Sequence, residues 1–235
     1  MGIVCQEKEC INNLTVIHST NLPVSKLKFM VKHKPVQQAV KRFMDIILSL
    51  TAIILSSPLF LLLIIIIKLD SKGPAIFKQE RVGFREKIFY MYKFRSMVED
   101  AEEQFEKVKD LNHTNPVMFK SKKDPRITKI GKIIRKCSLD ELPQLFNILK
   151  GEMSLVRPRP PLPRELLKYE EHHMVKFLKP PGLTGLWQIS GRANIKDFDK
   201  VIELDYEYIR TWNILLDLKI IFKTIFVVIS AKGAG

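Results

Sequence analysis

Two adjacent acids, Asp140 and Glu141, stand at the start of an apolar helical pattern and are the strongest candidates for chemistry. A carboxylate at a helix N-terminus stays ionised, beside backbone N–H groups that suit a phosphate. The same pair also fits a purely structural role, because Ser138 and Glu141 have the spacing of a capping box. The pattern alone favours the capping role.

Several cations accompany this pair in the sequence. In the stretch Arg157-Pro-Arg159-Pro-Pro, a stiff backbone would hold two guanidinium groups that suit forked contacts with phosphate oxygens. A proline-rich linker has the same composition. Basic and aromatic residues alternate in Tyr92-Lys-Phe-Arg95, so a strand would place Lys93 and Arg95 on one face. A plain amphipathic strand gives the same pattern.

Charge and composition limit the class of protein. The 235 residues include 39 Lys and Arg against 25 Asp and Glu, for a net charge of +14. This excess indicates a polyanionic partner, while the 46% hydrophobic content excludes a wholly disordered chain. Three cysteines without a CxxC pair argue against a disulfide framework or a zinc site. The pair His172-His173 has no partner at metal-ligand spacing and is expected at the surface.

An uncharged apolar run from Ile46 to Ile67 predicts a membrane segment. Pro58 follows two serines near the middle of the run, so the helix should break there, with serine hydroxyls satisfying the carbonyls that the proline frees. Basic residues flank both ends, which favours placing both ends on the cytoplasmic side. The sequence leaves two topologies open, a re-entrant helical hairpin and a single span.

Other elements follow from local patterns. Residues 73–97 predict a hairpin, 98–113 a solvated helix, and 127–136 a basic helix. The clearest helical pattern covers 138–151 and ends at a glycine. Residues 214–229 predict either an interfacial helix or a buried core helix.

Taken together, these segments closely resemble the bacterial sugar transferase family, the monotopic phosphoglycosyl transferases. The resemblance covers roughly residues 40–225. The matching motifs are the Ser-Pro-broken apolar helix at 41–67, Tyr92-Lys-Phe-Arg-Ser-Met97, Gly131-Lys-Ile-Ile-Arg135, Ser138-Leu-Asp-Glu-Leu-Pro-Gln-Leu145, Pro158-Arg-Pro160, Pro181-Gly-Leu-Thr-Gly-Leu-Trp-Gln188 with Ser190-Gly-Arg192, and Glu203-Leu-Asp205.

The resemblance implies a mostly α fold with small β elements, in a monotopic membrane protein with a re-entrant N-terminal helical hairpin and a cytosolic catalytic domain. The expected parts are a polar N-terminal extension (1–40), a re-entrant membrane helix (41–72), a catalytic domain (73–212) and an apolar interfacial C-terminal helix (213–235). The expected location is the bacterial cytoplasmic membrane, with the catalytic domain on its cytoplasmic face.

Members of this family transfer a sugar-1-phosphate from a nucleotide sugar, usually UDP-linked, to undecaprenyl phosphate and release UMP. The resemblance implies that Asp140 is the nucleophile, through a covalent aspartyl-phosphosugar intermediate, and that Glu141 assists as a metal ligand or base. Asp140 and Glu141 are the expected ligands of Mg²⁺, which prefers oxygen. The expected substrate- and phosphate-binding residues are Lys93, Arg95, Arg135, Arg159, Arg192 and Asp205, and the expected membrane kink is formed by Ser57 and Pro58.

The expected partners are a UDP-sugar donor, undecaprenyl phosphate and anionic membrane lipids, with no nucleic acid; a homodimer is compatible with this interpretation. The reaction would initiate exopolysaccharide, capsule or glycoconjugate synthesis. Gly185-Leu-Trp-Gln188 resembles the hexose-using branch, which favours galactose or glucose. Arg157 departs from the family, which commonly has Gly there. The alternative hypothesis is a non-enzymatic, membrane-tethered basic binding protein.

Overall fold

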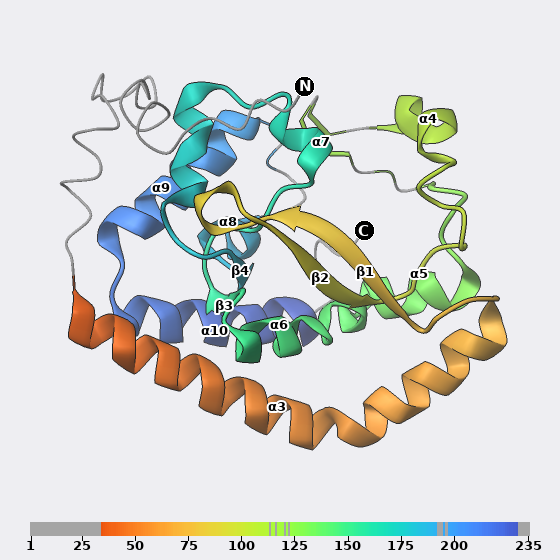
Figure 1. Ribbon diagram of the computed structural model, residues 1–235, viewed down its shortest axis with the longest axis horizontal. Coiled ribbons are helices and arrows are strands. Elements are labelled where there is room, and N and C mark those ends of the chain that lie inside the picture. The colour runs from red at the N-terminus through yellow and green to blue at the C-terminus, as the bar shows by residue number, and fades with distance from the viewer. Residues whose placement is uncertain are drawn as a thin grey trace.

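The computed structural model describes residues 34–229 except 113, 116, 120, 122, 192–194 and 196. Short helices and two small sheets rest on a layer that contains the long helix α3 and the C-terminal helix α10 (Figure 1). The expected mostly α fold with small β elements is confirmed. The elements in chain order are α3 (Pro35–Asp70), β1 (Ile76–Val82), η1 (Phe84–Glu86), β2 (Ile88–Phe94), α4 (Phe105–Val108), η2 (Lys109–Leu111), α5 (Lys129–Lys136), η3 (Leu139–Glu141), α6 (Gln144–Lys150), β3 (Ser154–Val156), α7 (Pro163–Leu166), η4 (Glu171–Leu178), β4 (Gly182–Thr184), α8 (Leu186–Ile189), α9 (Phe198–Thr211) and α10 (Ile214–Ile229).

Helix α3 is 36 residues long and curves so that its concave side faces the domain (Figure 1); Pro58 lies inside it, closer to its C-terminal end. Pro58 has no N–H to donate to the carbonyl of Ile54, four residues earlier. The hydroxyl of Ser57 donates to that carbonyl instead, at 2.8 Å. This contact confirms the predicted compensation by serine, whereas the predicted break does not occur: the helix continues through Pro58 to Asp70.

The convex side of α3 is apolar and exposed. Leu55 and Leu61 keep 77% and 65% of their surface exposed. Within the described ranges, α3 is the one helix long and apolar enough to cross a membrane. It begins at Pro35, before the predicted membrane segment at 41–72. Both the re-entrant topology and the domain boundaries stay predictions.

The opposite side of α3 is tied to the domain by buried polar contacts. The Nζ of Lys41 lies 2.7 Å from a carboxylate oxygen of Asp217 on α10. Asp45 accepts a hydrogen bond from the backbone N–H of Leu155, at 3.1 Å. Because these contacts join α3 to α10 and β3, the long helix is part of the domain and holds a fixed orientation against it.

Strands β1 and β2 form the antiparallel hairpin that the sequence predicts over 73–97. Phe77 pairs with Lys93, and Gln79 pairs with Met91. Side chains alternate faces along a strand, so Phe77, Gln79 and Arg81 share one face with Lys93. Strands β3 and β4 form a second, parallel pair.

The single helix predicted over 138–151 is wrong. The segment divides into the short turn η3 and the helix α6, with Pro143 at the start of α6. Ser138 adopts a left-handed conformation with φ 54° and makes no capping hydrogen bond through its side chain. An N-cap needs an extended backbone, so the predicted capping box does not form. Gly151 does end the helix in a left-handed conformation, as predicted.

Two further expectations are wrong. The helix predicted over 98–113 is reduced to the short turns α4 and η2, because the segment has few apolar residues to pack. His173 was expected at the surface but is only 4% exposed. It is packed against Tyr169 and Phe198, with ring centroids 5.5 and 4.8 Å away.

The largest core cluster supports the proline-rich loop that follows β3. Val201 and Ile202 of α9 are fully buried in it. Tyr208, also on α9, donates a hydrogen bond from its hydroxyl to the carbonyl of Val156 at 2.8 Å. Helix α9 therefore fixes the backbone from which Arg157 and Arg159 extend.

Candidate active site

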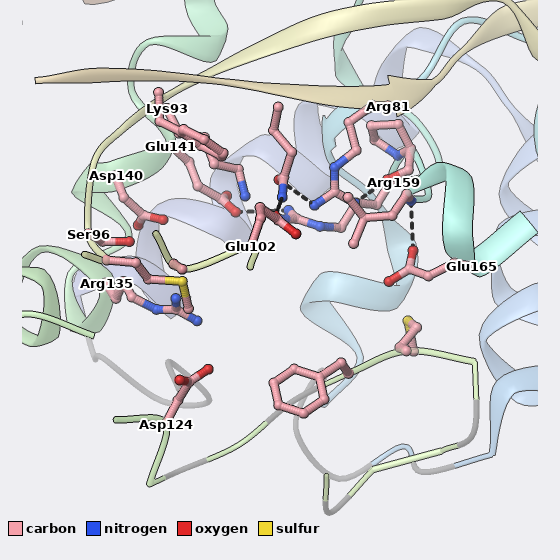
Figure 2. A pocket seen from close by; sticks show the side chains of 18 of the residues that line it. Arg81, Lys93, Ser96, Glu102, Asp124, Arg135, Asp140, Glu141, Arg159 and Glu165 are labelled. Carbon is pink, nitrogen blue, oxygen red and sulfur yellow. Dashed lines mark hydrogen bonds and ion pairs between the residues drawn. The ribbon is translucent and has the colours of Figure 1, made fainter. Parts of the chain in front are cut away.

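A cavity of about 520 Å³ lies beneath the β1–β2 hairpin, between η3 and the proline-rich loop (Figure 2). This volume is in the range of small-molecule and cofactor sites. Figure 2 shows the acids of η3 and Lys93 toward one end, with Arg81 and Arg159 toward the other. The residues predicted from the sequence that line the cavity are Lys93, Arg95, Arg135, Asp140, Glu141 and Arg159.

Asp140 reaches the cavity because the chain turns sharply after α5. The left-handed conformation of Ser138 makes this turn, and such a backbone is uncommon for residues other than glycine. Burial raises the pKa of Asp140, and the neighbouring Glu141 raises it further, while Lys93 and Arg135 oppose the shift. Burial and the repulsion between the two carboxylates therefore disfavour the ionised form of Asp140.

Glu141 faces Arg159 across the cavity, with the guanidinium Nη1 2.8 Å from the carboxylate Oε1. Burial disfavours the charge of Arg159, but Glu141 and Asp140 outweigh it and raise its pKa. The ion pair is about four-fifths buried on both sides. It brings together the acidic motif and the proline-rich motif, which were identified separately in the sequence.

Lys93 is the cation with the most perturbed environment. Burial, together with the charges of Arg159 and Arg81, lowers its pKa to about 7, although Glu141 and Asp140 favour the charged form. The unfavourable effects of burial and of the two arginines on the charge of Lys93 therefore exceed the favourable effects of the two carboxylates. This environment favours an anionic ligand near Lys93, and its phosphate-binding role stays a prediction.

Arg81 is a site residue that the sequence reasoning missed. It donates to the carbonyl of Pro160 at 2.9 Å and to the side-chain oxygen of Gln79 at 2.8 Å. Burial and the charge of Arg159 lower its pKa to about 10. The alternation of side chains along β1 could have identified Arg81, since residues 77, 79 and 81 share a face with Lys93.

The structure corrects the phosphate-binding role expected for Arg95. Its guanidinium donates to the carbonyls of Pro74 and Ser71, both at 2.6 Å, and to that of Ile67 at 3.3 Å. Arg95 therefore fastens β2 to the C-terminus of α3, even though part of its side chain lines the cavity. Alternation along β2 predicted the face on which Arg95 lies, but it could not predict the backbone carbonyls to which Arg95 donates.

The other three residues predicted to bind substrate or phosphate are Arg135, Asp205 and Arg192, and they do not lie together. Arg135, on α5, lines the cavity beside Asp140, as expected (Figure 2). Asp205 does not line it; it is buried behind the wall, 3.2 Å from the Nζ of Lys176, and so its expected role at the substrate is wrong. Arg192 lies outside the described residues.

A second cluster joins His172, His173 and Asp199. The Nε2 atoms of both histidines lie within 2.8 Å of the same Asp199 oxygen. The Nδ1 of His173 accepts a hydrogen bond from the backbone N–H of Glu170, so Nε2 must carry the ring proton and donate to Asp199. With its Nε2 lone pair unavailable, His173 acts as a structural donor rather than a metal ligand.

Comparison with known proteins decides the family. The family model for bacterial sugar transferases matches residues 36–231. The chain belongs to the bacterial sugar transferase family. Both Asp140 and Glu141, and every cation described above, lie inside the matched range, so the site is part of the family domain.

The chain is similar to several curated proteins whose names describe sugar transfer or exopolysaccharide production. It is 49% identical over 194 residues to "Galactosyl transferase CpsE" of Streptococcus agalactiae, covering 83% of this chain and 43% of that protein. It is 45% identical over 202 residues to "Undecaprenyl-phosphate galactose phosphotransferase" of Salmonella typhimurium, covering 83% and 41%. The chain thus spans less than half the length of these relatives. "Exopolysaccharide production protein ExoY" of Rhizobium meliloti is 38% identical over 208 residues, covering 86% of this chain and 90% of its own length.

Proposed function

We infer that this protein is a phosphoglycosyl transferase that moves a sugar-1-phosphate from a UDP-sugar to undecaprenyl phosphate and releases UMP. The inference rests on family membership and on one observation in particular. Two adjacent carboxylates, Asp140 and Glu141, line the same cavity as the cations Lys93, Arg135 and Arg159. Both substrates carry phosphate, so the reaction needs cations to gather them and a nucleophile among those cations.

The proposed reaction has two displacement steps at one phosphorus. In the first, a carboxylate oxygen of Asp140 attacks the sugar-bearing phosphorus, the bond to the bridging oxygen breaks, and UMP leaves with that oxygen and its electron pair. In the second, a phosphate oxygen of the lipid attacks the same phosphorus. The bond to Asp140 breaks, and its carboxylate is restored. Lys93 and Arg159 are placed to balance the charge that moves between phosphate oxygens.

The acidic pair fits a divalent cation. Its donors are carboxylate oxygens, which Mg²⁺ prefers, and the mutual repulsion that raises the pKa of Asp140 would be relieved by such an ion. Asp140 and Glu141 are therefore the proposed Mg²⁺ ligands. When bound, the ion would neutralise the diphosphate of the donor.

The arrangement of the apolar helices supports a membrane-facing enzyme. The exposed convex side of α3 and exposed apolar residues of α10, such as Phe222 and Phe226, would contact lipid. The curvature of α3 directs both of its ends toward the domain (Figure 1), as a re-entrant helix requires. We propose that the helix re-enters the cytoplasmic face of the bacterial membrane and that the cavity opens to the cytoplasm, where UDP-sugars are made.

A transfer assay with a panel of labelled donors tests this function. Purified protein in detergent is given undecaprenyl phosphate, Mg²⁺ and radiolabelled UDP-galactose, UDP-glucose or UDP-N-acetylgalactosamine. We expect labelled lipid and an equal amount of UMP, with a hexose donor preferred. Asp140→Asn should abolish both products, while Asp110→Asn, at an exposed position on η2, should not.

The same assay distinguishes the alternative, a membrane-tethered binding protein. That hypothesis predicts bound donor but no lipid product and no UMP with any donor in the panel. Such a result, with the protein folded and the acceptor shown to be competent, would reject the transferase.

A further inference from the structure

A second, smaller cavity of about 30 Å³ lies where α3 begins and α9 ends; Arg157 of the proline-rich loop lines it, whereas Arg159 lines the active-site cavity. Eight residues line it, and four of these are the cations Lys34, Arg157, Lys179 and Arg210. None of the eight is an acid. Its volume accommodates two or three water-sized groups, which is enough for some of the oxygens of a phosphate but not for a nucleotide or a sugar.

Arg157 is the central residue of this cavity. Its side chain is 92% buried, since only 8% of its surface is exposed, yet its Nε has no hydrogen-bond partner among the described residues. Its guanidinium lies over the indole of Trp212, 5.6 Å from the ring centroid. A stacked guanidinium keeps its N–H groups free at the edge of the plane, where they can donate to an anion.

The surrounding charges are not balanced by acids. Burial and the charge of Arg157 lower the pKa of Lys179. Asp217, a buried acid on α10, accepts hydrogen bonds from Lys41 at 2.7 Å and from two residues that line the cavity, Tyr208 at 2.7 Å and Trp212 at 3.1 Å. Within the part of the chain that the structure describes, none of the four cations of this cavity forms an ion pair with an acid, and the charge of Asp217 is paired with Lys41.

Apolar surface adjoins the cavity at the start of both membrane-facing helices. Val36, next to Lys34 at the start of α3, is 75% exposed, and Leu215, near Trp212 at the start of α10, is 77% exposed. Both helices begin on the same side of the molecule (Figure 1, left). A ligand with an anionic head and an apolar tail matches this combination, whereas a free soluble anion would use only the cations.

We propose that Arg157, Lys179, Lys34 and Trp212 form a binding site for the phosphate of an anionic phospholipid headgroup, separate from the transfer site. Arg157 does not line the active-site cavity, whereas Lys93, Arg135 and Arg159 do. The site would hold the junction of α3, α9 and α10 at the membrane surface. This inference does not depend on the transfer reaction, because binding can be measured without donor or acceptor.

The test measures ligand binding to the full-length protein in a neutral detergent. The chain has two tryptophans, so Trp187→Phe leaves Trp212 as the sole indole reporter beside Arg157. This protein is titrated with short-chain phosphatidylglycerol, with short-chain phosphatidylcholine and with inorganic phosphate. We expect a saturable change in Trp212 emission with phosphatidylglycerol, and a much weaker response to the other two.

Substitutions then assign the response to the cavity. Arg157→Gln should weaken the apparent affinity for phosphatidylglycerol by about tenfold or more, as expected for loss of a charge-assisted hydrogen bond. Lys179→Gln, at a half-buried position, should also weaken the affinity for phosphatidylglycerol. This variant replaces Arg157→Gln in the test if Arg157→Gln does not fold. Lys107→Gln removes the same charge from an exposed position on α4 and should bind like the parent.

The proposal is overturned if both cavity variants bind phosphatidylglycerol as the parent does. It is also overturned if inorganic phosphate saturates the response at the same concentration, which would identify a soluble anion as the ligand. Failure here would leave the transfer assay unaffected, and inactivity in that assay would leave this binding result unaffected.

Discussion

Arg95 and Lys93 lie two positions apart on β2, yet the structure gives them opposite roles, which leads to a sharp prediction. Arg95 donates to the carbonyls of Pro74, Ser71 and Ile67, whereas Lys93 lies among the charges of the active-site cavity. We expect Arg95→Met to destabilise the fold, and Lys93→Met to reduce turnover while leaving the fold intact.

The magnitude follows from the contacts that are lost. The carbonyl of Ile67 also accepts a hydrogen bond from the N–H of Ser71, so it keeps a partner. The carbonyls of Pro74 and Ser71 lose their bonds to Arg95, and a lost partner costs about 1–2 kcal/mol each where water reaches part of the site. Arg95→Met should therefore cost about 2–4 kcal/mol, or about 4–16 °C in Tm for a chain of this size.

Thermal unfolding in one fixed detergent, followed by circular dichroism, measures this difference. Arg164→Met is the matched control, because its ion pair with Glu102 is partly exposed on both sides, at 37% and 53%, and should contribute about 1 kcal/mol. Lys93→Met removes a charge that burial disfavours, so its Tm should be equal to or above that of the wild type, while turnover falls by about a hundredfold. The reasoning is refuted if Arg95→Met keeps the wild-type Tm but loses donor binding.

Two further predictions concern topology and acid stability. With cysteines placed at Lys34 and Lys72, a membrane-impermeant thiol reagent should label both sites from the cytoplasmic side only, and Pro58→Leu should move one of them to the other side; labelling from opposite sides in the parent would instead show a single span. Burial lowers the pKa of His173 below its ordinary 6.5, so the unfolded state takes up a proton that the folded state does not, and stability should fall as pH drops below about 6.5. His173→Phe should flatten the dependence of Tm on pH between 7 and 5, and an unchanged slope would show that other groups control it.

Local rules of the sequence predicted some features correctly. The hydrogen bond from Ser57 within α3 was predictable. A proline has no N–H to donate to the carbonyl four residues earlier, and Ser57 immediately precedes Pro58. The acids and cations of the cavity were identified from their motifs, since Asp140, Glu141, Lys93 and Arg159 are residue types that phosphate chemistry needs.

Other features depend on tertiary contacts that no local pattern reveals. The capping box was predicted from spacing, but Ser138 is held in a left-handed turn and Glu141 bonds to Arg159, which is 18 positions away. Arg95 and Asp205 were assigned to substrate from their motifs, although each is bonded to a partner within the protein. Motif matching found these residues but could not separate those that build the site from those that face the ligand.

The covalent adduct on Asp140 tests the central claim most directly. Wild-type protein is incubated with UDP-sugar and Mg²⁺ but without lipid acceptor, then quenched and analysed by mass spectrometry. We predict release of UMP in the same amount as a sugar-phosphate adduct, located on Asp140 and cleaved by hydroxylamine, as expected for an acyl phosphate. Asp140→Asn, which should fold normally because Asn is nearly isosteric with Asp, should form neither product. Near-normal turnover by Asp140→Asn, with no adduct on the wild-type protein, would contradict the two-step mechanism.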